Sequence, residues 1–369
     1  MDPRFLSRVK GKGSDLISCV EIKMEGPMEN VSVIGIDLAK RVFELCGVNH
    51  TGRVVLRKSV KRDRLLESVT SLLVRGGTVA MEACGSSNYW GRVFEAQGYR
   101  VKLIAPQHVA PFRKSQKNDC NDAEAIVEAA QRPTMRFVEL KSQRQLELQS
   151  LVRIREQIVG DRTALVNELH GILQEHGIES PRGVGKLKSF CETLLFESQE
   201  LSGVLRSILG ERLAALKALS DQLAFYTKQI KTIAQEHPLC RLAMTVPGVG
   251  PIGAVAFIAA ISRPNSFPNG RNFAAWLGLV PRQFSSGGKT SLGRITKRGD
   301  CFLRKTLVHG ARAVLFHASR KTDSLSLWVV KLKERKGMNL ATVALANKLA
   351  RILCSVLKTQ TPYQPLLTA

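Results

Sequence analysis

The sequence predicts a mixed α/β domain, then a long helical segment, and then a mainly helical C-terminal domain. Three observations support this. The chain has 369 residues, which is longer than one ordinary domain. Short apolar runs of strand type alternate with helical spacing between residues 31 and 106, and longer stretches with apolar residues three and four apart follow them. Hydrophobic residues make up 44% of the chain, which is enough to form a buried core in each part.

The first domain is expected over residues 31–135, after a mobile leader at residues 1–30 that has no clear periodicity. Three strands joined by short turns, followed by alternation of strands with helices, is the element order of a ribonuclease-H-like sheet, and other α/β folds share that order. The predicted strands are VSVIGIDLA, VFELCGV, GRVVLRKSV, GGTVAMEAC and RVKLIAP, and the predicted helices are RDRLLESVTSLLVR and SNYWGRVFEAQGY.

The second segment, residues 136–240, contains two stretches with apolar residues three and four apart, at 148–172 and 216–233. Two long helices are therefore expected to pair, either within one chain as a coiled coil or helical hairpin, or across a dimer. The third domain, residues 241–360, begins near VPGVGPIGA and ends in a basic, Leu- and Ala-rich helical tail. The glycine-rich opening resembles a helix-hairpin-helix turn that binds phosphate, and equally fits a turn between helices that binds nothing.

The charge balance is strongly basic, with 55 Lys and Arg against 31 Asp and Glu, a net charge of +24 and a pI near 10.1. Such an excess is typical of proteins that bind nucleic acid, and ribosomal and membrane-surface proteins share it. The longest apolar runs are broken by charge before the ~20 residues that a membrane span needs, and residues 1–20 contain no signal-peptide core. The prediction is a cytoplasmic protein with no membrane partner.

Four acidic residues are candidates for a metal site. Asp37 and Glu82 each lie in an apolar strand, where an ionised carboxylate is costly unless it is paired or binds a cation. Asp119 and Asp122 lie three residues apart at the expected start of a helix, on one face of its first turn. Taken singly, each can be a helix cap or a partnered core acid. Together they predict a two-metal phosphoryl-transfer site for Mg²⁺, and Mn²⁺ would also suit the four carboxylates.

A second candidate site lies in a basic segment, where residues 282–336 hold fourteen Lys or Arg against three acids. Ser285 and Ser286 precede Gly287 and Gly288, which allow the backbone to approach a ligand closely. Composition alone favours a flexible loop that only contacts phosphates, because no His or Asp general base is adjacent; a serine nucleophile is the alternative. The residues expected to hold backbone phosphates are Lys289, Arg294, Lys297, Arg298 and Arg304.

Several ordered motifs then resemble one family. GIDLAK, MEACG and KNDCNDAEA in the first domain, with VPGVGP, FAAWLGLVPRQFSSGGK and GRITKRGDCFLRKTL in the third, are similar to the DEDD transposases of bacterial insertion sequences, the "one-ten" family. The resemblance covers residues 31 to about 357. The leader before Met28 has no counterpart in the family pattern.

The resemblance implies a first domain like that of RuvC-type Holliday-junction resolvases, with Asp37, Glu82, Asp119 and Asp122 as its catalytic, metal-binding acids. It implies that Ser286 is a nucleophile, with Ser285 as the neighbouring alternative, and so reverses the preference for a passive loop. It further implies assembly through the coiled coil into a dimer or tetramer, with acids of one subunit facing the serine of another. A structured noncoding guide RNA, the bridge RNA, would select donor and target DNA.

Two other functions remain open at this point. A metal-dependent junction nuclease would use the same acids with water as the nucleophile. A nonenzymatic nucleic-acid scaffold would keep the acids for structural reasons.

Overall fold

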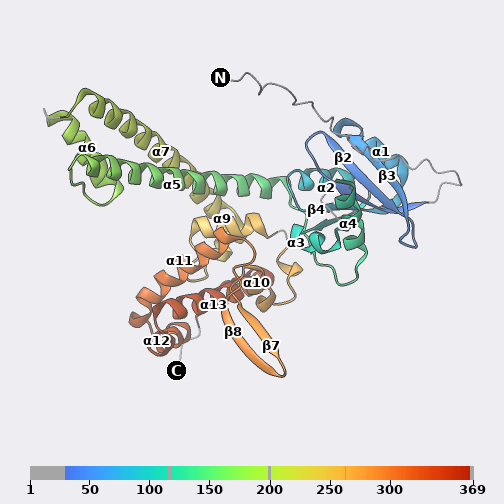
Figure 1. Ribbon diagram of the computed structural model, residues 1–369. Coiled ribbons are helices and arrows are strands. Elements are labelled where there is room, and N and C mark those ends of the chain that lie inside the picture. The colour runs from blue at the N-terminus through green and yellow to red at the C-terminus, as the bar shows by residue number, and fades with distance from the viewer. Residues whose placement is uncertain (1–29, 115–118, 198–200, 262, 366–369) are drawn as a thin grey trace, which may run out of the picture. The chain divides into compact units, whose positions relative to one another are not determined.

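The computed structural model describes residues 30–114, 119–197, 201–261 and 263–365. This described chain divides into two compact units between Ser142 and Gln143 (Figure 1). The N-terminal unit contains a mixed α/β sheet and the C-terminal unit is mostly helical, which confirms the predicted α/β and helical parts. The leader predicted at residues 1–30 lies outside the described residues, apart from Asn30.

Within the described part of the N-terminal unit, six strands form one sheet in the order β3-β2-β1-β4-β5-β6. The three central strands β1, β4 and β5 are parallel, and the others pair antiparallel. The five predicted strands are confirmed; β6 was not predicted, because two exposed residues carry no periodic signal. The strands are β1 (Val31–Asp37), β2 (Val42–Val48), β3 (Val54–Lys61), β4 (Leu73–Glu82), β5 (Arg100–Ile104) and β6 (Phe137–Val138).

Helices cover both faces of this sheet. Ile34 and Ile36 of β1 point to one face, where they pack in a core with α1 and α2, and Gly35 points to the other face, under α4. A Cβ on Gly35 would lie 2.7 Å from the Ala123 carbonyl oxygen, so glycine is what lets α4 sit directly on β1. The helices are η1 (Arg62–Arg64), α1 (Leu65–Leu72), α2 (Ser87–Ala96), α3 (Pro106–Val109), η2 (Ala110–Phe112) and α4 (Asp119–Gln131).

The C-terminal unit begins with two long helices, α5 (Gln143–Glu175) and α7 (Gly203–Glu236), which pack against each other (Figure 1). At one end they enclose α6 (Val184–Glu197) in a leucine-rich core of their own. At the other end their side chains join the large core of the C-terminal helices, including Leu148 and Ile230. The two predicted long helices are confirmed, whereas a coiled coil stays a prediction. The segments predicted as 136–240 and 241–360 therefore share one unit from residue 143 on.

Helices α8, α10, α11 and α12 of this unit pack against α13, whose residues Leu345, Leu349 and Leu353 are completely buried. Among the described residues, α13 is the one helix long and apolar enough to cross a membrane, and 56% of its most apolar 18-residue stretch is buried in this core. The helices are α8 (Pro238–Met244), α9 (Pro251–Ala260), η3 (Pro264–Ser266), α10 (Gly270–Trp276), α11 (Cys301–His317), η4 (Ala318–Arg320), α12 (Ser324–Lys336) and α13 (Met338–Thr359).

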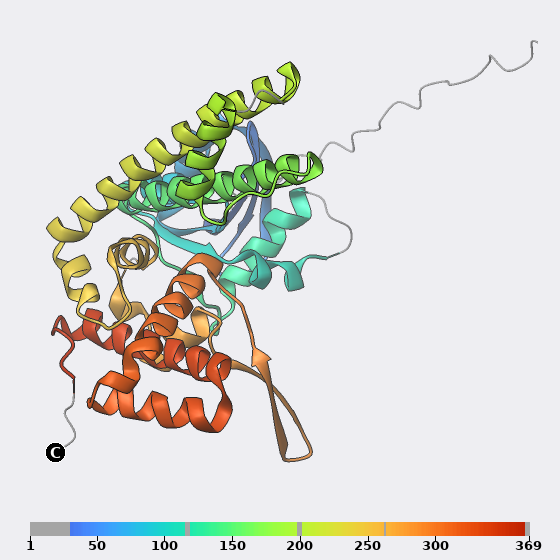
Figure 2. The same cartoon turned by 90° about the vertical axis from the view of Figure 1, so that its left-hand side faces the viewer.

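The serine segment is a β-hairpin and not the loop predicted from composition. Strands β7 (Pro281–Ser286) and β8 (Lys289–Ile295) pair antiparallel through a two-residue turn. The turn residues Gly287 and Gly288 have φ values of +54° and +77°, as a type I′ hairpin turn requires. The hairpin extends away from the helices of its unit (Figure 2), and nearly all of its strand side chains are exposed. Because no strand face is buried, the sequence carries no apolar alternation there.

Candidate active site

Asp37 and Glu82 are the last residues of neighbouring parallel strands. Ile36 of β1 pairs with Met81 of β4, so the two acids that follow them lie at the same level and at the same edge of the sheet. Both Ile36 and Met81 point into the core under α1 and α2. Since successive side chains alternate, Asp37 and Glu82 both point to the opposite face, which carries α4. The structure thus brings these two predicted acids together.

The Cys84 thiol responds to both of these acids. Its pKa is raised, first by desolvation and then by the negative charges of Glu82 and Asp37. Both carboxylates act on the same thiol, as expected for two acids at one edge of the sheet. The electrostatics of Cys84 therefore agree with the strand register.

Glu44 adds a third strand carboxylate to this edge, and the sequence analysis missed it. It is the register partner of Asp37 on β2, so both side chains point to the α4 face. Its carboxylate accepts a hydrogen bond from the Ser59 hydroxyl at 2.6 Å and lies 3.6 Å from the Cys120 sulfur, which is part of a disulfide and has no proton to donate. Cys120 is the second residue of α4, so the N-terminal end of α4 lies at the level of Asp37. The available signal was a single acid in the apolar run VFELCGV.

The helix α4 carries the other two predicted acids. Asp119 is its first residue, and the described structure does not include its side chain. Asp122 is buried, with 6% of its surface exposed, and its carboxylate pairs with the Arg113 guanidinium. Within the described side chains, no three His, Cys, Asp or Glu residues group closely enough to hold a metal ion. The convergence of all four acids stays a prediction, which the strand register and the placement of α4 support.

The donor chemistry at this edge fits a hard divalent cation. Asp37, Glu82 and Glu44 supply only oxygen ligands, which Mg²⁺ and Mn²⁺ prefer. The buried Asp122 carboxylate pairs with the Arg113 guanidinium, and a carboxylate has further acceptor positions beyond one such contact. Residues of this set suit a Mg²⁺ site better than a zinc site, which takes nitrogen and sulfur ligands.

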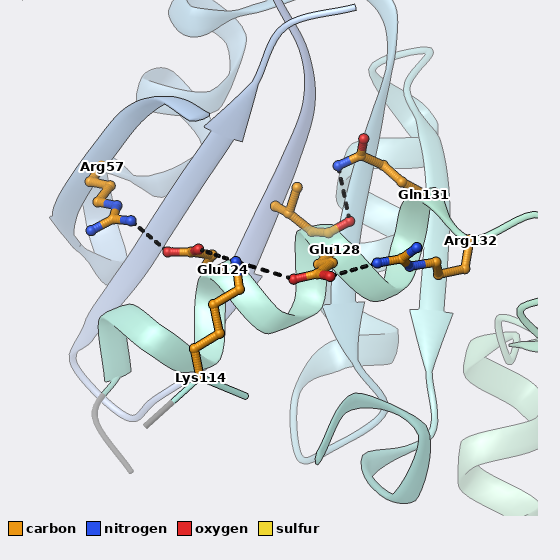
Figure 3. A network of polar contacts seen from close by, with 7 residues as sticks. Arg57, Lys114, Glu124, Glu128, Gln131 and Arg132 are labelled. Atoms are coloured by element: carbon orange, nitrogen blue, oxygen red, sulfur yellow. Dashed lines mark hydrogen bonds and ion pairs between the residues drawn. The ribbon is translucent and has the colours of Figure 1, made fainter. Parts of the chain in front are cut away.

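Two more acids on α4 have a different, structural role (Figure 3). Glu124 accepts from the Arg57 guanidinium at 2.5 Å and from the Lys114 ammonium at 3.1 Å. Glu128 pairs with Arg132 at 2.6 Å and with Lys114 at 3.5 Å. The hydrogen bond to Glu124 is the main cause of a raised pKa for Lys114. This network links α4 to β3 and to Lys114, which precedes the helix. It therefore helps to fix the position of the first turn of α4, which contains Asp119 and Asp122.

The two candidate nucleophiles lie on β7 in the C-terminal unit and differ in their partners. The Ser285 hydroxyl accepts from the Gln283 side-chain amide at 2.8 Å and lies 3.4 Å from the Thr290 hydroxyl. Ser286 pairs in register with Lys289 across the turn. Its hydroxyl has no hydrogen-bond partner in the part of the chain that the structure describes, and the residue is exposed. Ser286 is therefore the less engaged of the two hydroxyls.

The five predicted phosphate-binding cations follow the turn of this hairpin. Lys289, Arg294, Lys297 and Arg298 are exposed. Arg304 on α11 is instead half-buried, and its guanidinium donates to the carbonyl oxygens of Leu277 at 3.1 Å and Arg298 at 3.0 Å. Arg304 thus has a structural role at the base of the hairpin, in addition to any phosphate contact.

The VPGVGPIGA segment forms the turn between α8 and α9. Gly248 in this turn has a φ of +79°, and a Cβ there would lie 2.8 Å from the Gly310 carbonyl oxygen of α11. This glycine is therefore required for close packing of the turn on α11. Such a structural role agrees with the alternative that the segment is a turn between helices that binds no ligand. Phosphate binding at the turn stays a prediction.

Comparison with known proteins gives one consistent family. Residues 34–178 match the sequence profile of the IS110 DEDD transposase domain, and residues 240–325 match that of the IS116/IS110/IS902 transposase family. The chain is 43% identical to the transposase for insertion sequence element IS1111A of Coxiella burnetii, over 93% of this chain and 94% of that protein. It is 44% identical to a probable family 20 transposase of Pseudomonas aeruginosa, over 91% and 99% of the two chains. It is 37% identical to the transposase for IS1328 of Yersinia enterocolitica, over 88% and 96%.

Proposed function

We propose a serine-nucleophile mechanism for this chain, which belongs to the IS116/IS110/IS902 family of insertion-sequence transposases. The protein is a DNA recombinase, and its DEDD domain implies dependence on a divalent metal ion. We infer that the ion is Mg²⁺, with Mn²⁺ as a working substitute, and that the acids of the N-terminal unit hold it. The observation that carries this proposal is the shared edge and shared face of Asp37 and Glu82.

In this mechanism the Ser286 oxygen attacks a DNA phosphodiester. A bond forms between that oxygen and phosphorus, and the bond from phosphorus to the 3′ oxygen breaks. The serine proton leaves through a nearby carboxylate and ends on the departing 3′ oxygen, which becomes a free hydroxyl. A 3′ hydroxyl of another strand then displaces the serine and restores a phosphodiester, so no bond energy is lost to water. Two such rounds, through a four-way junction, would complete the transfer of the element.

Bound Mg²⁺, held by Asp37, Glu82, Asp119 and Asp122, would neutralise charge on the phosphate under attack. Lys289, Arg294, Lys297 and Arg298 would position the DNA backbone beside Ser286 without reading its sequence. Arg304 would act mainly by holding the base of the hairpin.

A structured guide RNA as the selector of donor and target DNA is part of the same proposal. The net charge of +24 supports a second polyanionic partner beside DNA. Assembly into a dimer or tetramer is supported by exposed apolar residues on the long helices. Ile154 of α5 is 43% exposed and Phe225 of α7 is 57% exposed, and both line a hollow of about 520 Å³. We also propose a cytoplasmic location, where DNA and RNA are both accessible.

The decisive experiment looks for DNA covalently linked to the protein. Wild-type protein, Ser286→Ala and Ser285→Ala would be incubated with donor and target DNA, the guide RNA and Mg²⁺, and resolved on denaturing gels. The adduct is expected with wild type and with Ser285→Ala, and is expected to be lost in Ser286→Ala with DNA binding retained. An unchanged adduct in Ser286→Ala would exclude this nucleophile. Cleavage without any adduct would favour the junction nuclease that uses water.

The scaffold alternative has its own test. Asp37→Asn and Glu82→Gln are each expected to lower strand exchange by at least 100-fold at saturating Mg²⁺, in the range seen when a group that stabilises the transition state is removed. Strand exchange that persists unchanged in both variants would make the acids structural, as a nonenzymatic scaffold supposes.

A further inference from the structure

A hollow of about 790 Å³ lies on the N-terminal unit, outside the candidate active site. It is formed by the β1–β2 turn, the end of β3 with η1, and the start of α2. Four cations and one acid line it, so its charged lining carries a net charge of about +3. The hollow is called the Tyr89 groove, and it is lined by Lys40, Arg41, Val42, Lys61, Arg62, Asp63, Leu66, Tyr89, Trp90 and Val93.

The groove contains an exposed aromatic ring, Tyr89, that packs on a buried aromatic ring, Trp90. Tyr89 is 50% exposed and contacts the Trp90 ring edge to face, with ring centroids 5.2 Å apart. Trp90 is 6% exposed and packs edge to face on the fully buried Phe43, at 5.8 Å. A lone exposed tyrosine on a surface is ordinary. Here the ring contacts one buried aromatic partner, Trp90, which itself packs on Phe43, so part of the ring's motion is already restricted before a flat ligand stacks on it.

Among the residues that the structure describes, no carboxylate pairs with the cations of the groove. The Arg62 guanidinium lies 5.6 Å from the centroid of Trp90 and 5.9 Å from that of Phe43, held by the rings and not by a carboxylate. Within the described chain, none of Lys40, Arg41, Lys61 and Arg62 forms an ion pair. The cations around α4 show the contrast, because Arg57, Lys114 and Arg132 are each paired with a glutamate in Figure 3.

The groove adjoins the edge of the sheet that carries the acids. Lys40 follows Asp37 by three residues, and α2 begins at Ser87, five residues after Glu82. Phe43 and Trp90 belong to the core on the α1 and α2 face, whereas Asp37 and Glu82 point to the α4 face. The groove and the acids are thus on opposite faces of one sheet edge, close in the chain and chemically distinct.

We propose that the Tyr89 groove binds an unpaired stretch of nucleic acid, with one base stacked on Tyr89 and adjacent phosphates held by Arg41, Lys61 and Arg62. Cations that form no ion pair with any described residue, around an exposed ring that packs on a buried one, are the combination that suits single strands. A base inside a duplex is already stacked on both sides and cannot use the ring. RNA and DNA share this chemistry, and the test separates them. Whether the bound nucleic acid is the guide RNA or the DNA substrate depends on the proposed function. Binding of a single nucleic-acid strand by the groove does not depend on it.

The first experiment measures binding of full-length protein by fluorescence anisotropy. The probes are a 12-nucleotide oligo(U) RNA, a 12-nucleotide oligo(dT) DNA and a 12-base-pair DNA duplex, at one fixed salt concentration. Tyr89→Ala is expected to weaken binding of at least one single strand by roughly 5- to 150-fold, the range for loss of one base stack, and to leave duplex binding within twofold. Tyr89→Phe, which keeps the ring, is expected to bind as wild type does. The matched control is Phe316→Ala, an aromatic residue that is 70% exposed in the other unit.

The second experiment needs no variant and so does not depend on folding of Tyr89→Ala. Oligonucleotides carrying 5-iodouracil, as RNA and as DNA, would be photocrosslinked to wild-type protein and the modified peptides identified by mass spectrometry. A crosslink at Tyr89 with one of the two probes would support the proposal and identify that nucleic acid. No crosslink in residues 87–96 with either probe would overturn it, as would equal loss of single-strand and duplex binding in Tyr89→Ala. The covalent-adduct assay on Ser286 reports separately on the proposed function.

Discussion

Carboxylates of the N-terminal unit differ chiefly in their neighbours. Glu124 and Glu128 are neutralised by basic side chains and hold α4 in place. Asp37 and Glu82 lie side by side at strand ends, and both raise the pKa of the Cys84 thiol. Two like charges in one place are unfavourable without a cation. Asp37 and Glu82 therefore differ from Glu124 and Glu128 in their shared position at two neighbouring strand ends and not in residue type.

Alkylation of Cys84 can test the proximity of these acids without an activity assay. The thiolate is the reactive form, so a raised pKa means a small reactive fraction at pH 8. Glu82→Gln removes a charge that raises this pKa, and is expected to increase the rate of alkylation by iodoacetamide by roughly two- to tenfold. Asp37→Asn should act in the same direction and more weakly, because Asp37 contributes less to the shift. Rates would be measured peptide by peptide with mass spectrometry.

Cys301 is the internal control for this measurement. It is exposed and belongs to the other unit, so its rate should be the same in every variant. If the Cys84 rate stays at the wild-type value in both variants, Asp37 and Glu82 do not share this edge of the sheet in solution.

At the scale of elements, the β7–β8 hairpin depends on its turn. Its strands bury almost no side chains, so pairing rests on backbone hydrogen bonds and on the two glycines with positive φ. A β-branched residue in that conformation costs about 1–2 kcal/mol per position. Replacing both Gly287 and Gly288 by Val is expected to unfold the hairpin and to lower covalent-adduct formation at least tenfold.

The thermal unfolding of the C-terminal unit provides the comparison. The core around α13 contains no residue of the hairpin strands except the partly buried Ile295, so the double valine variant should unfold within a few degrees of wild type. Gly287→Asn creates the Asn-Gly turn that this geometry favours, and should keep wild-type adduct levels. Full activity of the double valine variant would show that Ser286 needs no hairpin.

The elements differ in how far the sequence predicted them. Strands β1 to β5 followed from short apolar runs, and helices α5 and α7 from apolar residues three and four apart, because all of these elements bury apolar side chains. The residues of strand β6 and of the hairpin are almost all exposed, so their sequences contain no apolar pattern from which a strand could be predicted. Asp37 and Glu82 are adjacent because β1 and β4 are neighbours in the sheet, and this strand order and register cannot be read from a single sequence. Glu44 was overlooked for the same reason, since its importance comes from its cross-strand partner.

At the scale of the whole molecule, each unit has its own cores. Phe94 is completely buried in the core of the N-terminal unit, and Leu349 is completely buried in that of the C-terminal unit. Phe94→Ala is expected to cost about 3–5 kcal/mol of unfolding free energy, and Leu349→Ala about 2–5 kcal/mol. If the units unfold separately, each variant should lose hydrogen-exchange protection only on its own side of residue 142.

Hydrogen exchange followed by mass spectrometry makes this comparison directly, because the two variants serve as controls for each other. Loss of protection across both units in either variant would mean that they fold as one cooperative body.

The alternation of side chains along β1 has a consequence for inheritance. Ile36 faces the core and Asp37 faces α4, so gain or loss of one codon within this strand would turn the carboxylate to the wrong side of the sheet. Such a copy would keep its reading frame and its basic charge, and in the proposed mechanism it would lose one of the acids that hold the metal ion. A count of intact open reading frames would include any such copy, although the proposed mechanism could not operate in its product.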